Sequence, residues 1–238
     1  MEIFNLPNEC KIDKNIPKEM IYKNAEANEK LKRVFIDTVE KIRFMYKRCH
    51  LKFMYLLNFS NSNIQNYIND KERFEEIDFI KIILREKGKE NIISKLFHQL
   101  IPKSTVIILE FKTEILISTC NKKIEKERVI AEEVFNSNWI DIENKMLKEL
   151  EYKKLNSTNL KVFYEDIIEK VRIINLSKKL NYETNIESKN LELLEKLNKE
   201  IEELKVIRKK ETQLNRITEI QTKLLKKIEE RNKILRKE

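Results

Sequence analysis

The chain has 238 residues and a formal net charge of +9 at pH 7, and 37% of its residues are charged. Its single glycine and three prolines are too few for the many tight turns of an all-β protein, which this composition excludes. Hydrophobic residues, at 41%, suffice for a core, so we expect a mostly helical α+β fold whose basic character suits an anionic partner.

The cysteines give a first indication of the compartment. Cys10, Cys49 and Cys120 are far apart and form no CxxC pair. An odd number of such thiols is typical of a reducing compartment. The first residues show no signal peptide, and no apolar segment has the length of a membrane span. We therefore expect a cytoplasmic protein with no membrane partner.

The N-terminal part combines an arm with a helix. The first twenty residues, which include Pro7 and Pro17, are expected to form an ordered extended arm. An apolar stripe with helical spacing follows and predicts a helix from residue 24 or 25 to residue 47. Among the segments before residue 180, this one has the clearest helical pattern.

A strand and a short helix are expected next. Residues 76–85 are rich in β-branched side chains and predict a strand, after which Gly88 permits a turn. An amphipathic helix over residues 92–100 ends before Pro102.

Further β elements and one helix complete the globular part. Residues 105–109 and 114–118 predict a hairpin, and residues 129–134 predict a strand or a short amphipathic segment. A helix with an apolar face over residues 163–174 follows, with Asn159 as its candidate N-cap.

Together these elements predict an α+β globular domain over residues 1–180. Its sheet would be small, with three or four mainly antiparallel strands, and helices would cover it on one face. A long helical tail over residues 186–238 would follow as a separate part.

The tail contains neither glycine nor proline, and its apolar residues recur every three or four positions. This spacing predicts a coiled coil or a helical hairpin with one apolar stripe. The stripe changes phase at residues 208–213, where the absence of a helix breaker favours a continuous or kinked helix. A stripe of this length needs a partner or a second copy, so we predict partner binding by Leu194, Leu197, Ile201, Leu204, Leu214, Ile217, Leu224 and Ile228.

The second half of the tail carries most of the excess positive charge. Residues 205–238 contain twelve lysines or arginines and five glutamates. Clustered bases bind phosphate oxygens without reading base sequence, so non-specific nucleic-acid contact is predicted. The alternative is a solvated lysine-rich face without DNA contact. The candidate nucleic-acid-binding residues are Lys205, Arg208, Lys209, Lys210, Arg216, Lys223, Lys226 and Lys227.

One triplet is similar to a catalytic motif. Glu110 and Lys112 stand two positions apart, as do the acid and the lysine of restriction-endonuclease-like sites, and Asp78 on the preceding predicted strand could complete a Mg²⁺ site. Such triplets also arise by chance in a highly charged chain, and this one falls at the tip of the predicted hairpin. We predict no metal site and no cofactor as the main hypothesis, since His50 and His98 have no second ligand at metal-binding spacing.

The order of five sequence blocks resembles that of a bacterial family of uncharacterised proteins of about this length. Genes of that family tend to lie beside DNA methyltransferases and superfamily-2 helicases, in restriction-modification-like or phage-defence islands. The resemblance implies this context and no catalytic residue. The blocks are residues 4–10 with 16–18, 31–46, 134–140, 159–164 and 210–216.

We therefore expect an accessory, non-enzymatic interaction subunit of a DNA methyltransferase–helicase type system. Its tail would bind a methyltransferase or helicase subunit or a second copy, and its bases would assist non-specific DNA contact. Two alternatives stay open. One is a Mg²⁺-dependent nuclease that uses Asp78, Glu110 and Lys112, and the other is a structural coiled-coil scaffold without DNA contact.

Overall fold

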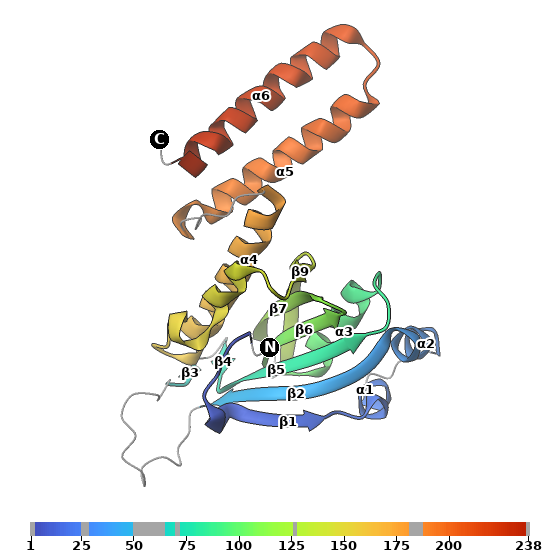
Figure 1. Ribbon diagram of the computed structural model, residues 1–238, viewed down its shortest axis with the longest axis vertical. Coiled ribbons are helices and arrows are strands. Elements are labelled where there is room, and N and C mark those ends of the chain that lie inside the picture. Colours follow the sequence, from blue (N-terminus) through green and yellow to red (C-terminus); the bar gives the residue numbers. More distant parts are fainter. Residues whose placement is uncertain are drawn as a thin grey trace. The chain divides into compact units, whose positions relative to one another are not determined.

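The chain divides into two compact units, Met1–Val171 and Arg172–Glu238, and each is described by itself (Figure 1). The first unit is an α+β domain and the second is helical. The helix α4 (Leu160–Leu180) begins in the first unit and ends in the second. The computed structural model describes residues 3–24, 29–49, 65–69, 72–125, 128–180 and 188–236.

Within the described residues, the first unit is built on a seven-stranded sheet in the order β1-β2-β5-β6-β7-β8, with β9 also paired to β7. Neighbouring strands are antiparallel, except that β5 and β6 are parallel. The sheet is therefore mixed, and it is larger than the three or four strands predicted. Its strands are β1 (Lys11–Asn15), β2 (Val39–Cys49), β5 (Glu76–Leu84), β6 (Ser104–Phe111), β7 (Glu114–Glu125), β8 (Arg128–Asn136) and β9 (Ile140–Asp141), while β3 (Tyr67–Ile68) and β4 (Arg73–Phe74) form a small separate sheet.

The parallel pair β5–β6 arises because a helix connects its strands. Gly88, with a φ of 104°, lies in the turn that leads from β5 to α3 (Glu90–Leu100). A crossover of this kind returns the chain to the edge from which β5 started, so Ser104 pairs with Ile77. The predicted strand, short helix and β6–β7 hairpin are confirmed, as is the strand over residues 129–134.

The predicted helix over residues 24–47 is wrong in its second half, because the chain from Val39 onward is the strand β2. This strand lies between β1 and β5, and pairing on both sides supplies its backbone hydrogen bonds. Long-range pairing here overrides the local helical spacing. Ile42, Phe44 and Tyr46 also recur at every second position, which is a strand pattern. The helical segments before β2 are α1 (Lys18–Asn24) and α2 (Glu29–Thr38).

One face of the sheet packs against α2 and α3. Alternate residues of β5, including Ile80 and Ile82, belong to a buried cluster with Phe35 of α2 and Phe97 of α3. The rings of Phe35 and Phe97 are stacked with their centroids 6.0 Å apart. This cluster is the main hydrophobic core of the first unit.

The opposite face is also covered, which corrects the prediction of a sheet covered on one face. Phe79 points to this face, and its ring meets the buried ring of Phe4 at a centroid distance of 5.0 Å. The carbonyl oxygen of Phe4 accepts a hydrogen bond from the backbone N–H of Tyr152, whose ring contacts Phe163 of α4. Phe4 and Leu6 are both buried and thus anchor the N-terminal arm. The short 3₁₀ turns are η1 (Asn8–Cys10), η3 (Lys145–Leu150) and η4 (Tyr152–Lys154).

The helix α4 begins at its predicted cap. The side-chain oxygen of Asn159 accepts a hydrogen bond from the backbone N–H of Val162 at 3.0 Å, which satisfies one donor of the first turn. One turn later, the fully buried hydroxyl of Tyr164 lies 3.0 Å from the carbonyl oxygens of both Thr105 and Cys120. The start of α4 is therefore fixed to the backbone of β6 and β7.

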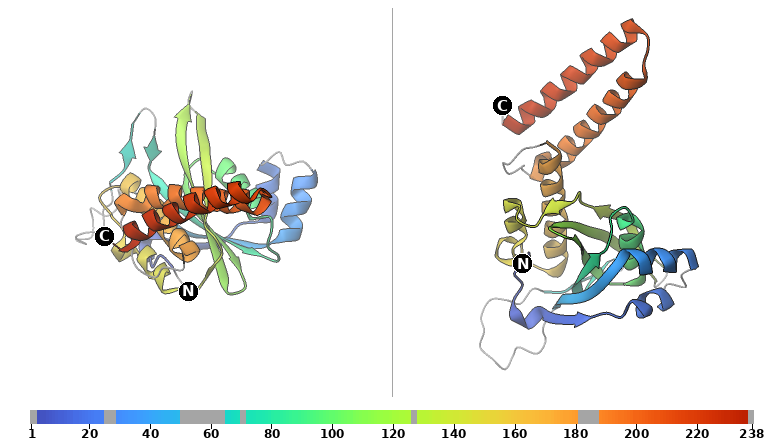
Figure 2. Two further views of the ribbon diagram at one scale, coloured as in Figure 1. Left: turned by 90° about the horizontal axis from the view of Figure 1, so that it is seen from above. Right: turned by 45° about the vertical axis from the view of Figure 1, so that its right-hand side comes forward.

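The second unit contains an antiparallel helical hairpin of α5 (Ser188–Lys210) and α6 (Leu214–Arg236) (Figure 2). The preference for one continuous or kinked helix is therefore wrong. The break needs neither glycine nor proline, because the carboxylate of Glu211 accepts hydrogen bonds from the N–H groups of Thr212 and Gln213. These bonds lower the pKa of Glu211 and satisfy amides that precede α6.

The end of α4 packs on this hairpin. Leu176 is buried with Leu191 and Leu194 of α5, and Ile234 and Leu235 of α6 pack against the same cluster. Leucines from three helices thus form a hydrophobic core of the second unit.

Candidate functional site

The three residues of the nuclease hypothesis do not come together. Asp78 pairs with Thr105 across the parallel strands, so Glu110 lies five residues further along β6, which is about 16 Å at about 3.3 Å per residue. Glu110 pairs with Ile83, which lies five positions after Asp78 on β5. Because successive side chains of a strand alternate between the two faces of the sheet, the carboxylates of Asp78 and Glu110 point to opposite faces. Lys112 lies in the β6–β7 turn with a φ of 54°. This geometry does not support a shared Mg²⁺ site.

Glu110 and Lys112 each have another contact. The Glu110 carboxylate forms an ion pair with Lys81 on the neighbouring strand. The ammonium of Lys112 lies 5.2 Å from the centre of the Phe111 ring, which is a cation–π distance. Among the described residues, no group of three or more histidine, cysteine or acidic side chains has the arrangement of a metal site.

Asp78 instead belongs to a buried polar region with Lys122. Burial raises the pKa of Asp78 to about 6, although the positive charges of Lys47 and Lys122 oppose the shift. One carboxylate oxygen of Asp78 accepts no hydrogen bond from any described residue. Burial lowers the pKa of Lys122 to about 8, and its ammonium donates to the carbonyl oxygens of Ile101 and Lys103 after α3. Lys122 thereby holds the α3–β6 connection in place.

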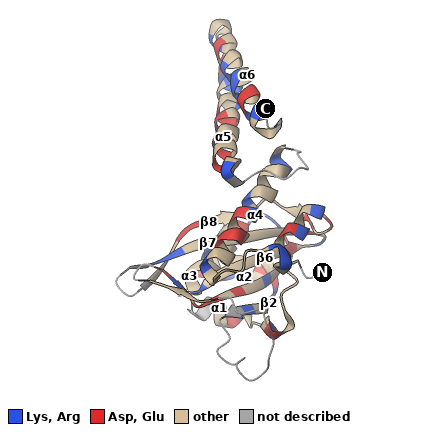
Figure 3. Ribbon diagram, turned by 90° about the vertical axis from the view of Figure 1, so that its left-hand side faces the viewer, with Lys and Arg blue, Asp and Glu red and all other residues tan. Residues whose placement is uncertain are grey.

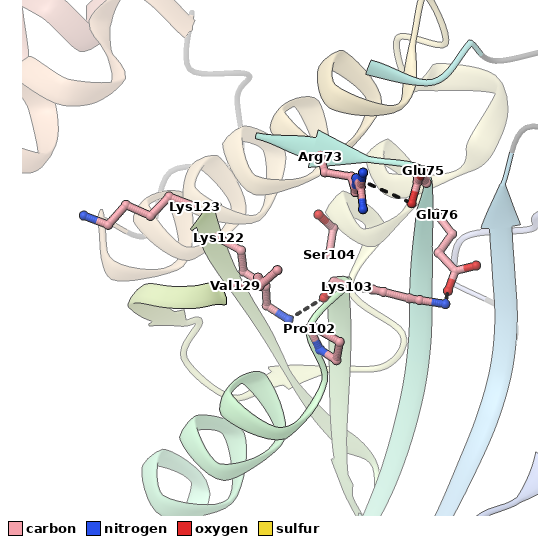
Figure 4. A pocket seen from close by; sticks show the side chains of 9 residues that line it. All are labelled: Arg73, Glu75, Glu76, Pro102, Lys103, Ser104, Lys122, Lys123 and Val129. Atoms are coloured by element: carbon pink, nitrogen blue, oxygen red, sulfur yellow. Dashed lines mark hydrogen bonds and ion pairs between the residues drawn. The ribbon is translucent and has the colours of Figure 1, made fainter. Parts of the chain in front are cut away.

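A pocket of about 210 Å³ lies beside this region, at the ends of β5 and β6 where both strands begin (Figure 4). No sequence pattern indicates this pocket, because its residues come from four separate stretches of the chain. They are Arg73, Glu75, Glu76, Pro102, Lys103, Ser104, Lys122, Lys123 and Val129.

A buried histidine–serine pair also has hydrogen-bond geometry. Nε2 of His98 lies 3.1 Å from the hydroxyl of Ser118. Burial, together with the charge of Lys122, lowers the pKa of His98 to about 3, so the ring is neutral at physiological pH. Both side chains are essentially inaccessible, at 1% and 0% exposure, so no substrate can reach them. We assign this pair to packing.

The apolar stripe of the tail is largely used within the chain itself. Leu194, Leu197, Ile201 and Leu224 are buried in the second unit, with at most 4% exposure. Leu204, Ile217 and Ile228 are half-buried. Leu214 is 77% exposed and is the one fully exposed member of the predicted set of eight. Folding back therefore removes most of the stripe that was predicted to need a partner.

The bases of the tail divide into two groups. Lys205 pairs with Glu202 at 2.8 Å and Lys227 with Glu200 at 3.0 Å, while Arg216 lies 3.9 Å from Glu211. Arg208 donates to the side-chain oxygen of Gln221. The remaining four are exposed and form no ion pair with any described residue: Lys209, Lys210, Lys223 and Lys226.

The antiparallel hairpin concentrates positive charge at its turn. Residues 188–204 carry a net charge of −2 and lie beside residues 224–236, which carry +3. The region around the turn, residues 205–223, has six lysines or arginines and two glutamates, which leaves +4. We call residues 205–223 the hairpin tip, and Figure 3 shows the charged positions along α5 and α6.

The hairpin tip also exposes large apolar side chains. Val206 and Ile207 at the end of α5 are 53% and 51% exposed, and Leu214 at the start of α6 is 77% exposed. Lys209 and Lys210 lie between them in sequence. Contiguous exposed apolar surface with a polar rim marks interaction sites in soluble proteins.

None of the helices that the structure describes is both long and apolar enough to cross a bilayer. No curated protein and no solved structure matches the chain. A family model described as "Domain of unknown function (DUF4391)" matches residues 4–231. Since this match covers nearly the whole sequence, the chain belongs to the DUF4391 family.

Proposed function

We propose that this protein is an accessory interaction subunit that docks onto a partner protein through its hairpin tip. The observation that carries this proposal is the exposure of Val206, Ile207 and Leu214 in a region of net charge +4. Exposed leucine and isoleucine favour a protein partner, since burying them contributes about 25 cal/mol per Å² of apolar surface. The positive charges favour a partner surface that is acidic.

A second copy of this chain fits the tip poorly. Two tips of charge +4 would repel each other on close approach, and the leucines that a dimer would share are already buried within the hairpin. Nucleic acid would form ionic contacts with the lysines but would leave the apolar side chains in water. An acidic protein surface with an apolar centre would both pair with the lysines and bury the apolar side chains.

The family resemblance gives the partner to test first. It suggests a DNA methyltransferase or a superfamily-2 helicase of a restriction-modification-like or phage-defence system. The accessory role would then be to connect such an enzyme to the α+β unit. The four unpaired lysines support a second, weaker role in non-specific DNA contact.

The test uses a double variant of the tip, Val206→Asp with Leu214→Asp. A methyltransferase or superfamily-2 helicase of the same host would be co-expressed with each form, and retention on the tagged chain would be measured after nuclease treatment. We expect the double variant to lose at least about 2 kcal/mol of binding energy, as central apolar contacts often do.

The matched control places aspartate at two exposed leucines outside the tip, Leu193→Asp with Leu225→Asp. It adds the same charge to the same two helices. Circular dichroism would establish that both variants keep their helices. Equal retention of the partner by the tip variant and the wild type would overturn the proposal.

A further inference from the structure

We propose that the pocket at the beginning of β5 and β6 binds a phosphate monoester group, carried either by a small molecule or by the end of a nucleic acid. The site lies entirely in the first unit and is independent of the hairpin tip. Its lining contains four lysines or arginines and two glutamates, which gives a net charge of +2. Nothing in the nuclease or docking hypotheses uses these residues.

Arg73 is the principal candidate for phosphate recognition. Its neighbour Phe74 is buried and packs against the ring of Tyr164 at a centroid distance of 6.1 Å, so the backbone of Arg73 is held at the edge of the pocket. The guanidinium lies 3.8 Å from Glu75, which is too long for a hydrogen bond, and both side chains are more than half exposed. Such a pair is weak, so the planar donors of Arg73 are available to a ligand.

Ser104 faces Arg73 across the pocket (Figure 4). This residue is only 5% exposed, and it lines the pocket. A phosphate oxygen between Ser104 and Arg73 would accept hydrogen bonds from both side chains.

The two acidic residues of the lining leave the positive potential largely intact. The carboxylate of Glu76 is already paired with Lys103 and, at 2.6 Å, with Lys47, so two cations compensate one acid. Lys122 adds a largely buried positive charge whose hydrogen bonds go to neutral carbonyl groups. Charges in such a partly buried cleft are screened less than on an open surface.

Size and apolar walls limit the ligand. Pro102 and the half-exposed Val129 provide apolar surface beside the charged groups. The volume of about 210 Å³ is below the range of about 300–1,000 Å³ that is usual for drug-sized ligands. The pocket therefore suits a phosphate with a small attached group better than a dinucleotide cofactor.

The test is a titration of the full-length, isotope-labelled protein, followed by two-dimensional ¹H–¹⁵N spectra at constant ionic strength. The probes are inorganic phosphate, a nucleoside 5′-monophosphate, and one oligonucleotide with either a 5′-phosphate or a 5′-hydroxyl. We expect saturable shifts of the Arg73, Lys103 and Ser104 amides. Binding of the mononucleotide supports a small-molecule source, and binding of the 5′-phosphorylated oligonucleotide alone supports a nucleic-acid end. Absence of saturable shifts with every phosphate, or equal binding of the 5′-hydroxyl oligonucleotide, would overturn the proposal.

Three variants distinguish binding in the pocket from non-specific attraction of phosphate to the positively charged protein. Arg73→Glu is expected to weaken binding about tenfold or more, and Ser104→Ala by a smaller factor, because each loses a hydrogen bond to a charged group. Lys95→Glu makes the same charge change on the exposed face of α3, away from the pocket lining, and is expected to leave binding unchanged. If Lys95→Glu weakens binding as much as Arg73→Glu, the pocket is not the site. Ser104→Ala keeps the test valid if Arg73→Glu perturbs folding.

Discussion

The hydroxyl of Tyr164 accepts a hydrogen bond from the backbone N–H of Cys120 at 3.1 Å. This hydroxyl lies just beyond the paired part of β6 and β7, whose last pair on that side is Ile107 with Ser118. The carbonyl oxygens of Thr105 and Cys120 are both 3.0 Å away, so the same hydroxyl also donates within this gap. A side chain of α4 thus continues the ladder that the two strands leave incomplete.

Removal of this hydroxyl should destabilise the first unit. In Tyr164→Phe, a buried N–H and buried carbonyl oxygens lose their partner, so the free energy of unfolding should fall by about 1–3 kcal/mol. Urea denaturation followed by fluorescence of the single tryptophan, Trp139, would measure it. Tyr67→Phe is the control, because among the described residues its hydroxyl accepts a hydrogen bond from the exposed Asn69, and its loss should cost less than about 0.5 kcal/mol. Equal losses in both variants would contradict the role given to Tyr164.

The buried carboxyl of Asp78 should make folding depend on pH. Its pKa rises from 3.8 to about 6, so its contribution to stability is fully present below pH 3.8 and is lost as the pH rises through about 6. The loss corresponds to about 3 kcal/mol. Asp78→Asn cannot ionise, so its stability relative to the wild type should increase between pH 4 and pH 7.

His98 acts in the opposite direction over an overlapping range. Its pKa is lowered to about 3, so its contribution is present above about pH 6.5 and is lost as the pH falls toward 3. For this reason the measured quantity must be the difference between Asp78→Asn and the wild type, in which the His98 contribution cancels. A difference that stays constant from pH 4 to pH 7 would show that Asp78 is not the titrating group.

The turn of the hairpin should depend on one carboxylate. In Glu211→Ala, the N–H groups of Thr212 and Gln213 lose their acceptor, so the second unit should melt at a lower temperature. Glu219→Ala, which removes an exposed carboxylate from α6, serves as control and should melt as the wild type does. Thermal melting by circular dichroism would compare them, and identical curves for both variants would count against this account of the turn.

If the hairpin binds DNA, the four lysines without an ion pair to a described residue should determine how steeply the affinity falls with salt concentration. Replacement of Lys209, Lys210, Lys223 and Lys226 by glutamine should reduce the slope of log affinity against log salt by up to about 3.6, at about 0.9 per phosphate contact. Fluorescence anisotropy with a short duplex would give the slopes. The control replaces four exposed lysines of the first unit by glutamine, Lys89, Lys95, Lys145 and Lys148, at the same change in net charge. If both quadruple variants give the same slope, the hairpin has no specific part in DNA contact.

The elements that could be predicted are those with a local cause. Asn159 caps α4 through a bond to Val162, three residues away, and the β6–β7 hairpin follows from two short apolar runs around a turn. The strand β2 could not be recognised from spacing alone, because its partners are remote in sequence: Val39 pairs with Leu84. The helical hairpin was one of two alternatives for the tail, and the preference for a continuous helix was wrong because the carboxylate of Glu211, and no glycine or proline, supports the turn.

Sites that depend on tertiary structure were harder still. The triplet from Glu110 to Lys112 has the right spacing, but Lys112 lies in the turn and Asp78 on the other face. The pocket joins Arg73 to Val129 across more than fifty residues, and no sequence pattern relates them. The net charge of the hairpin tip can be counted from the sequence. Its position at one end of the hairpin follows from the antiparallel arrangement of α5 and α6.

The contrast between local and remote pairing also has a consequence for folding rates. The helices α5 and α6 are joined by three residues, so the hairpin needs only the closure of a very short loop and should form within microseconds. The sheet must bring β2 to β5 and carry the chain over α3 before β6 can pair. Stopped-flow refolding should therefore show a gain of helical signal that is complete before the first reading, followed by a slower phase in which Trp139 becomes ordered. The hairpin would then be the earliest structured part of the molecule.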